Sequence, residues 1–211
     1  MKVEIWSDYA CPFCYIGKRR FEEALEQFPD RDQVEVVYRS FELDPTAPLR
    51  VEQDIHDMLA SKYGMPREQA IATNHNVTAQ AKSVGLEYNL DTMILTNTLD
   101  AHRLTHLAAE QVLAKELNER LLRAYFTDSL NLGDHEVLAD LAEEVGMNRT
   151  KALEVLASNQ YTEAVRADEQ EAGQLGIQGV PFFVMDRAYG VSGAQSLEVF
   201  LDALHKAAAS E

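Results

Sequence analysis

Two cysteines, Cys11 and Cys14, are the residues of this chain with the clearest chemistry, and the motif Cys-Pro-Phe-Cys separates them by two positions. An apolar run precedes them, and apolar residues recur at helical spacing from Pro12 onward, which predicts a helix that begins at the motif. Pro12 suits a first helical turn because its φ is already helical and its missing N–H would have had no partner there. We therefore expect both cysteines at a helix N-terminus.

This position predicts different roles for the two thiols. Unpaired N–H groups and the positive end of the helix dipole favour an anion, so the Cys11 thiol is expected to ionise more easily than a free cysteine. Cys14 lies one turn further into the helix and is more sheltered. Cys11 is thus the candidate attacking sulfur of a thiol-disulfide exchange, and Cys14 the resolving sulfur that closes a small disulfide ring.

Other interpretations of the cysteine pair stay open. The two thiols could be inert buried groups, or they could bind zinc, since a CxxC pair in a reducing compartment indicates either redox chemistry or metal binding. Zinc needs two further ligands, which His102 and His106 could supply from one helix face, but their distance along the sequence from Cys14 is unlike that in compact zinc modules. We therefore expect no metal.

Composition narrows the class of protein. The chain has 211 residues, of which 46% are hydrophobic, enough for one core or for a compact domain with a sizeable insertion. Its net charge of −16 argues against nucleic-acid partners, and its one basic cluster, residues 18–20, is interpreted as a solvated helix face. No signal-peptide pattern and no run of about 18 apolar residues is found, so we expect a cytoplasmic protein without a membrane partner.

The order of the predicted elements describes an α/β protein with an insertion. Residues 34–43 read as a second strand, which should be parallel to the first because a helix joins them. A helical block then runs from Asp54 to about Leu175, and its expected caps and stops include Gly64, Asp134, Gly146 and Asn148. A strand after Pro181, a short antiparallel strand and a last helix close the chain. We expect one domain from residues 1–50 and 176–211, and an inserted helical domain from residues 51–175.

This series of segments resembles the thioredoxin superfamily, within it the DsbA-like branch, and more narrowly the cytoplasmic FrnE-type members of that branch. The resemblance spans nearly the whole chain, and the segments that carry it are residues 7–8, 11–18, 39–45, 97–104 and 179–183. It implies a thioredoxin fold with a large all-helical insertion between the second and third strands. It also implies a protein disulfide oxidoreductase that acts on thiol- or disulfide-containing proteins or on small thiols.

The resemblance also assigns roles to particular residues. It implies a cis peptide bond between Val180 and Pro181, packed against Cys11, with the backbone of Val180 offered to a cysteine-containing peptide. Pro12 and Phe13 lie inside the disulfide ring and support the site, where strongly oxidising members carry a histidine. The segment 97–104 is expected to border the active-site cleft, with Asn97, His102 and Arg103 as its candidate residues.

Two alternative functions use the same architecture. The hydroxychromene-carboxylate isomerases and kappa-class glutathione transferases share the inserted helices, but they usually place serine at the position of Cys11 and lack the second thiol. A non-catalytic peptide-binding module is the other alternative. For the leading interpretation we expect no bound cofactor beyond the redox-active disulfide, with glutathione as a candidate co-substrate.

Overall fold

The computed structural model describes residues 1–209 and divides the chain into two compact units. The sheet unit comprises residues 1–43 and the chain from residue 166 onward, and the helical unit comprises residues 44–165. These divisions lie several residues before the positions 50 and 175 expected from the sequence. The second boundary lies earlier than expected because Asp168, in the helix of residues 162–174, binds Arg39 and the Ser40 amide. These contacts join that helix to the sheet.

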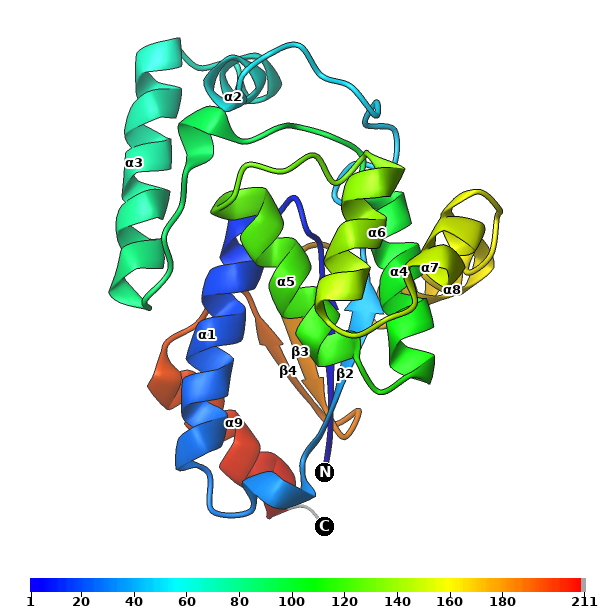
Figure 1. The fold of residues 1–211 in the computed structure, drawn as a ribbon. Helices are drawn as coiled ribbons and strands as arrows, with labels where there is room; N and C mark the ends of the chain where they lie inside the picture. The colour runs from blue at the N-terminus through cyan, green and yellow to red at the C-terminus, as the bar shows by residue number, and fades with distance from the viewer. Residues whose placement is uncertain (210–211) are drawn as a thin grey trace. The chain divides into compact units, whose positions relative to one another are not determined.

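The sheet unit is built from strands and helices that are far apart in the sequence (Figure 1). Its elements within residues 1–209 are, in chain order, β1 (Lys2–Ser7), α1 (Pro12–Gln27), the 3₁₀ helix η1 (Arg31–Gln33), β2 (Glu35–Ser40), most of α8 (Thr162–Gln174), β3 (Phe182–Met185), β4 (Tyr189–Ser192) and α9 (Leu197–Ala208). The predicted helix start at Pro12 is confirmed.

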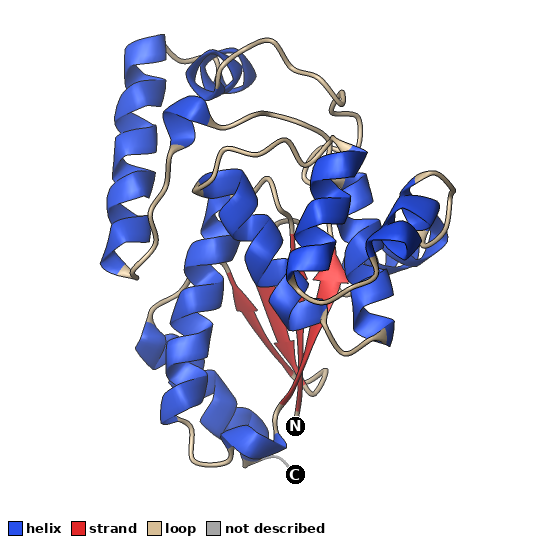
Figure 2. Cartoon of the chain, viewed as in Figure 1, coloured by secondary structure: helices blue, strands red, loops and turns tan. Residues whose placement is uncertain are grey.

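The four strands form one sheet in the order β2-β1-β3-β4, which Figure 2 shows in red. β1 and β2 are parallel, as predicted, and their last residues, Ser7 and Ser40, are partners in the register. β3 is antiparallel to β1 and to β4. The mixed sheet and the helices between its second and third strands confirm the predicted fold class.

The alternation of side chains along β1 distributes two different environments over the two faces of the sheet. Val3 and Ile5 pack on one face, in a core that includes Phe21 of α1 and Phe200 of α9. Trp6 points to the opposite face, where it packs against a second apolar cluster that includes Ala172 of α8. Successive residues of one strand therefore serve two cores, one under α1 and α9 and one under α8.

The helical unit has its own buried core, formed largely by leucine and alanine side chains. Its elements are α2 (Ile55–Tyr63), α3 (Arg67–Ser83), the 3₁₀ helix η2 (Leu90–Thr92), α4 (Leu99–Glu110), α5 (Ala114–Phe126), α6 (His135–Glu144) and α7 (Arg149–Leu156). The predicted caps are confirmed, because Asp134 and Asn148 accept hydrogen bonds from the first-turn amides of α6 and α7. Gly64 and Gly146 have positive φ at the ends of α2 and α6, as expected.

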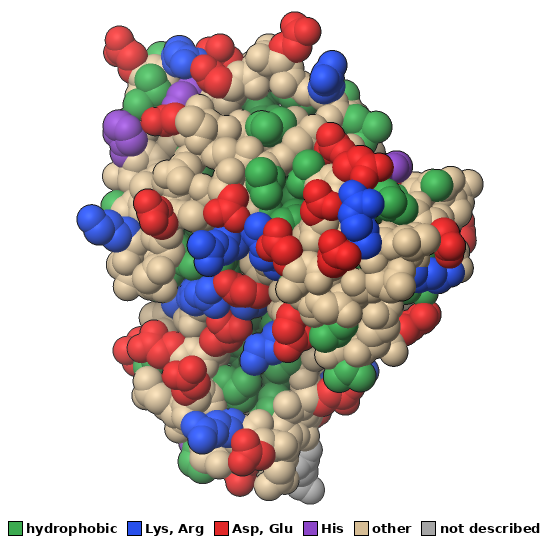
Figure 3. All heavy atoms as spheres, in the orientation of Figure 1, with side chains coloured by type: hydrophobic (Ala, Val, Ile, Leu, Met, Phe, Trp, Pro, Cys, Tyr) green, Lys and Arg blue, Asp and Glu red, His purple; other side chains and the backbone are tan. Residues whose placement is uncertain are grey.

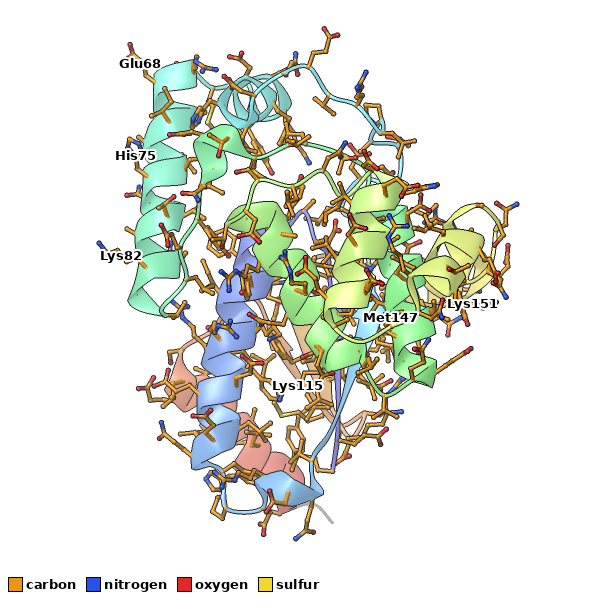
Figure 4. The ribbon with its side chains drawn as sticks, in the orientation of Figure 1. Glu68, His75, Lys82, Lys115, Met147 and Lys151 are labelled. Atoms are coloured by element: carbon orange, nitrogen blue, oxygen red, sulfur yellow. The ribbon has the colours of Figure 1, made fainter. Side chains whose placement is uncertain are left out.

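The surface carries the charge of the chain in mixed form. Glu68, His75 and Lys82 follow one another at seven-residue spacing along the outer side of α3 (Figure 4). Acidic and basic side chains are interspersed over the face of the molecule shown in Figure 3. Within residues 1–209, no helix is both long enough and apolar enough to span a membrane.

Candidate active site

The cysteine motif lies where β1 ends and α1 begins. Cys11 is the N-cap residue of α1, with extended backbone angles of φ −96° and ψ 110°, and Pro12 is the first helical residue. The amide of Cys14 donates a hydrogen bond of 3.0 Å to the Cys11 carbonyl, which closes the first turn. The local sequence therefore folds so that the two side chains, three positions apart, project from the same side of the helix start.

Both thiols are free and buried, with 5% of Cys11 and 2% of Cys14 exposed. Their side chains hydrogen-bond to each other. The Cys11 Sγ also donates to the Val180 carbonyl oxygen at 3.5 Å, and the peptide bond between Val180 and Pro181 is cis. The structure thus brings together two of the segments singled out in the sequence, residues 11–14 and 180–181.

Gly17 permits this close approach between α1 and the segment before β3. A Cβ atom at this position would lie 2.9 Å from Cγ of Pro181 and 3.4 Å from Cα of Ala194. The first distance is shorter than real Cβ contacts allow, and a proline ring has little freedom to move away. A glycine in a helix is unfavourable by itself, so the reason for it here is the packing of Pro181 against the helix.

The two thiols differ in their electrostatic environments. Burial raises the pKa of the Cys14 thiol, and its hydrogen bond with Cys11 and the charge of Cys11 raise it further. Hydrogen bonds from the Ser7 side chain and the Asp8 amide act in the opposite direction, but they are outweighed. Cys14 is therefore held as a neutral thiol at neutral pH.

Asp8 fixes the loop that carries the motif. Its carboxylate accepts hydrogen bonds from the amides of Ala10 and Leu43, at 3.3 and 2.8 Å. Its carbonyl accepts from the Cys11 amide at 3.2 Å, and its own amide donates to the Cys14 Sγ at 3.4 Å. This one buried residue therefore ties both cysteines to the end of the sheet.

A network of charged side chains occupies the other face of β1. Glu4 accepts hydrogen bonds from Arg39 and Arg187, and Arg39 also binds Asp168 at 2.9 Å. The guanidinium carbons of Arg39 and Arg187 lie over the Trp6 ring, 6.0 and 5.6 Å from its centroid. The indole N–H of Trp6 donates to the backbone carbonyl of Asp168. Burial alone would raise the pKa of Glu4, but the hydrogen bonds from Arg187 and Arg39 lower it overall.

Three predicted residues belong to the helical unit. The Asn97 amide donates to the Ala47 carbonyl, and its oxygen accepts from the first amide of α4. His102 is buried on α4, and Arg103 is buried beside it. The donors of Arg103 bind the Asp100 carboxylate and the carbonyls at the end of α7, which are those of Val155, Ser158 and Gln160. A role of Asn97, His102 and Arg103 in a cleft stays a prediction.

The side chains around the motif include one surprise. Phe13, between the two cysteines in the sequence, is 38% exposed, so its phenyl group lies at the surface next to Cys11. Lys18, in contrast, is buried and pairs with Glu22 at 2.7 Å, while Arg20 donates to the Ala194 carbonyl. The interpretation of residues 18–20 as a solvated helix face is therefore wrong for Lys18, because the lysine stem packs along α1 and its ammonium finds a carboxylate.

Sequence reasoning missed the contacts of Ser7, Asp8 and Gly17 with the site. The alternation of β1 was a usable signal for Ser7, because it lies two and four residues after Ile5 and Val3 and so faces α1. The isolated glycine in a helical pattern was a signal for Gly17, since such a residue often marks a close approach. Asp8 belongs to a segment that carries the resemblance, but no local pattern predicted its contacts, which include an amide 35 residues away.

The zinc interpretation of the cysteine pair requires further ligands close to the two thiols. Among residues 1–209, no group of three or more histidine, cysteine, aspartate or glutamate side chains is arranged to hold a metal ion. His106, one of the two histidines considered as zinc ligands, stacks on Tyr161 with ring centroids 6.3 Å apart.

Comparisons with known proteins agree with this geometry. A probable DsbA oxidoreductase from Streptomyces coelicolor is 50% identical, with a TM-score of 0.96, and the match covers 100% of this chain and 91% of that one. The uncharacterized protein YwbO of Bacillus subtilis (strain 168) is 29% identical over 204 residues, 96% of this chain and 94% of its own length.

A more distant structure shares the fold alone. A 2-hydroxychromene-2-carboxylate isomerase has a TM-score of 0.73 at 14% identity, and the match covers 100% of this chain and 97% of that one. The model of the DSBA-like thioredoxin domain matches residues 2–205, which include both cysteines and Pro181. The chain therefore belongs to the family of DSBA-like thioredoxin domains.

Proposed function

We propose that the protein is a thiol-disulfide oxidoreductase that works by dithiol-disulfide exchange through Cys11 and Cys14. One observation carries the proposal: two free thiols hydrogen-bond to each other at the start of α1, and the Cys11 sulfur contacts the Val180 carbonyl. Family membership supports an enzyme with a redox role. The isomerase fold is similar but the chemistry there is different, so the thiol pair and not the fold decides between the two functions.

The proposed reaction moves one electron pair in two substitution steps. The Cys11 thiolate attacks a substrate disulfide, so that a mixed disulfide forms and the first substrate sulfur leaves as a thiolate. The Cys14 thiolate then attacks the Cys11 sulfur, the mixed disulfide breaks, and the second substrate sulfur leaves. The substrate is reduced to two thiols and the protein is oxidised to the Cys11–Cys14 disulfide. The reverse sequence oxidises a dithiol.

The environments of the two thiols support this assignment of roles. Cys11 is the N-cap residue of α1, and its sulfur contacts the Val180 carbonyl oxygen beside the partly exposed Phe13, which places it as the attacking sulfur. Cys14 is more deeply buried, and its raised pKa keeps it protonated until the mixed disulfide has formed. A resolving thiol that stays neutral in the resting protein does not compete with Cys11 for the substrate.

The substrate class follows from the same chemistry. Proteins or peptides with accessible disulfides are the proposed substrates, with small thiols such as glutathione as co-substrates that return the protein to its starting state. We further propose that the protein works in the cytoplasm and belongs to the FrnE-type branch, as its resemblance implies. In a reducing compartment the exchange runs mainly toward substrate reduction.

Insulin reduction tests the proposal directly. We expect Cys11→Ala to lose the activity to the uncatalysed background, and Cys14→Ala to accumulate mixed disulfides that a reductant releases. The wild-type chain under the same conditions is the reference, and melting curves of both variants check that they fold. Activity that survives in Cys11→Ala would refute the proposal. Glutathione conjugation that persists in Cys14→Ala would favour the isomerase or transferase alternative.

A further inference from the structure

The end of β1 places a hydroxyl group beside the resolving thiol. Val3 and Ile5 pack in the core that α1 covers, and Ser7, the last residue of the strand, follows them at the same two-residue period. Ser7 is buried, with 8% of its surface exposed. Its side chain hydrogen-bonds to Cys14.

A second donor points at the same sulfur. The amide of Asp8 donates to the Cys14 Sγ at 3.4 Å, within the range of hydrogen bonds to sulfur. This amide cannot turn away easily, because the carboxylate of Asp8 is bound by the amides of Ala10 and Leu43, and its carbonyl is bound by the Cys11 amide. The Cys14 sulfur thus lies in a fixed site with two donors from adjacent residues.

The other charged or titratable groups close by in the chain are already engaged. The Asp8 carboxylate accepts hydrogen bonds from two backbone amides, those of Ala10 and Leu43. Lys18, one turn beyond Cys14 on α1, pairs with Glu22. Cys11 hydrogen-bonds to Cys14, and the segment before β3 presents the Val180 carbonyl.

We propose that Ser7 is a positioning residue for Cys14, and that its hydroxyl acts with the Asp8 amide to hold the Cys14 thiolate while it attacks the mixed disulfide. This inference rests on the proposed function. In the step itself, the Cys14 proton passes to solvent, the Cys14 thiolate forms a bond to the Cys11 sulfur, and the bond from Cys11 to the substrate sulfur breaks. The electron pair of the broken bond leaves with the substrate thiolate.

The size of the effect follows from opposing trends. A hydrogen bond to a charged group is worth about one unit of pKa, so loss of the hydroxyl should lower the fraction of Cys14 thiolate about tenfold below its pKa. The remaining thiolate becomes a better nucleophile by about threefold, because nucleophilicity rises with thiol pKa. Together, the tenfold lower thiolate fraction and the threefold higher reactivity should slow the attack of Cys14 on the mixed disulfide by about threefold. Above the pKa of Cys14 only the second trend remains, and the variant becomes the faster protein.

An aromatic disulfide separates the two steps in one experiment. Reduced protein mixed with dithionitrobenzoate should release one thionitrobenzoate as Cys11 attacks and a second as Cys14 closes the ring. Ser7→Val removes the hydroxyl. Ser7→Thr introduces a side chain of the same shape as valine but keeps the hydroxyl. We expect Ser7→Val to slow the second release about threefold at neutral pH and leave the first unchanged, with Ser7→Thr close to wild type. The ratio of wild-type to Ser7→Val rates should fall as the pH rises toward the pKa of Cys14.

Several outcomes would overturn the inference. They are an unchanged second release in Ser7→Val, equal slowing in Ser7→Thr and Ser7→Val, or a common change in both releases, which would indicate a general structural role. If the wild type shows no first release, the proposed function fails instead. The ultraviolet thiolate absorbance of Cys14 in a Cys11→Ala background then decides about Ser7, because Ser7→Val should raise the pKa of Cys14 and Ser7→Thr should not. Ser7→Ala replaces the pair in both measurements if the larger side chains prevent folding.

Discussion

The two faces of β1 treat buried polar groups in opposite ways. On the face toward α8, Glu4 has two arginine partners, and one of these, Arg39, binds a second carboxylate on Asp168. On the face toward α1, the strand is apolar until Ser7, and the thiol of Cys14 next to it has a raised pKa and no ionic partner among the hydrogen bonds that hold it. On the α8 face Glu4, Arg39 and Arg187 each have at least two partners of opposite charge. On the α1 face, the environment of Cys14 disfavours its thiolate, which is its reactive form.

This difference separates stability from reactivity along a single strand. A charge with several partners resists the loss of any one of them, and removal of the shared carboxylate leaves two cations close together. The thiols depend on a few backbone contacts, so changes there should alter rates more than the free energy of unfolding. Variants on the α8 face should therefore affect folding, and variants on the α1 face should affect exchange.

Glu4→Ala should produce the largest loss of stability. It leaves Arg39 and Arg187 without their shared carboxylate, and breaking a buried pair in this way costs about 3 to 5 kcal/mol. We expect about 3 kcal/mol, because both arginines reach solvent in part, which corresponds to a fall of about 6 to 12 °C in the melting temperature. Calorimetry measures the fall, and insulin reduction per folded molecule should stay unchanged.

Glu171→Ala is the matched control for Glu4→Ala. Glu171 binds the same Arg187 at 2.7 Å, but a third of its side chain is exposed, so its loss should cost less than about 1 kcal/mol. Equal losses from the two variants would show that the buried position of Glu4 has no special weight. A loss of exchange activity in folded Glu4→Ala would show that the two faces are coupled.

Gly17→Ala should have the next largest effect, and it acts on the α1 face. The added methyl group would lie 2.9 Å from the Pro181 ring, so the helix and the segment before β3 must separate, at about 1 to 3 kcal/mol. Separation also moves the Val180 carbonyl away from the Cys11 sulfur, and insulin reduction should fall severalfold in the folded variant. The fall should be measured well below the melting temperature.

Gly173→Ala provides the comparison for this substitution. Gly173 lies in α8, and a Cβ atom there meets nothing within 4 Å, so alanine should be neutral or stabilise the protein by about 0.4 to 1 kcal/mol. Normal activity in both variants would mean that the Pro181 contact does not position the site.

The parts of the fold that the sequence predicts are those set by local patterns. The strand of Val3 and Ile5, the helix start at Pro12 and the caps Asp134 and Asn148 each depend on residues within one or two turns. The division between the units depends on contacts that span more than a hundred residues, such as Arg39 with Asp168. No pattern near residue 166 records such a contact, so that boundary could not be placed from the sequence.

The site divides in the same way. The spacing of Cys11 and Cys14 is local and could be read at once, whereas the packing of Gly17 on Pro181 joins segments 164 positions apart. Lys18 was misread because charge alone suggests solvent, while its burial depends on the carboxylate of Glu22 one turn later. The family resemblance predicted that Pro181 packs near Cys11, but only the three-dimensional structure shows that Gly17 provides the space for the Pro181 ring.

Acid should weaken the α8 face before it alters the thiols. The pKa of Glu4 is lowered in the folded protein from its ordinary value of 4.5, so the folded state binds this proton less readily than the unfolded chain. The stability that Glu4 contributes is therefore fully present above about pH 4.5. It is lost as the pH falls through the lower pKa of Glu4 in the folded state. Urea unfolding at a series of pH values should show this loss, and Glu4→Gln should be less stable at neutral pH with a shallower decline in acid. Parallel curves for the two proteins would mean that other carboxylates dominate the acid response, and that the ion network on this face is not what distinguishes it from the face that carries the thiols.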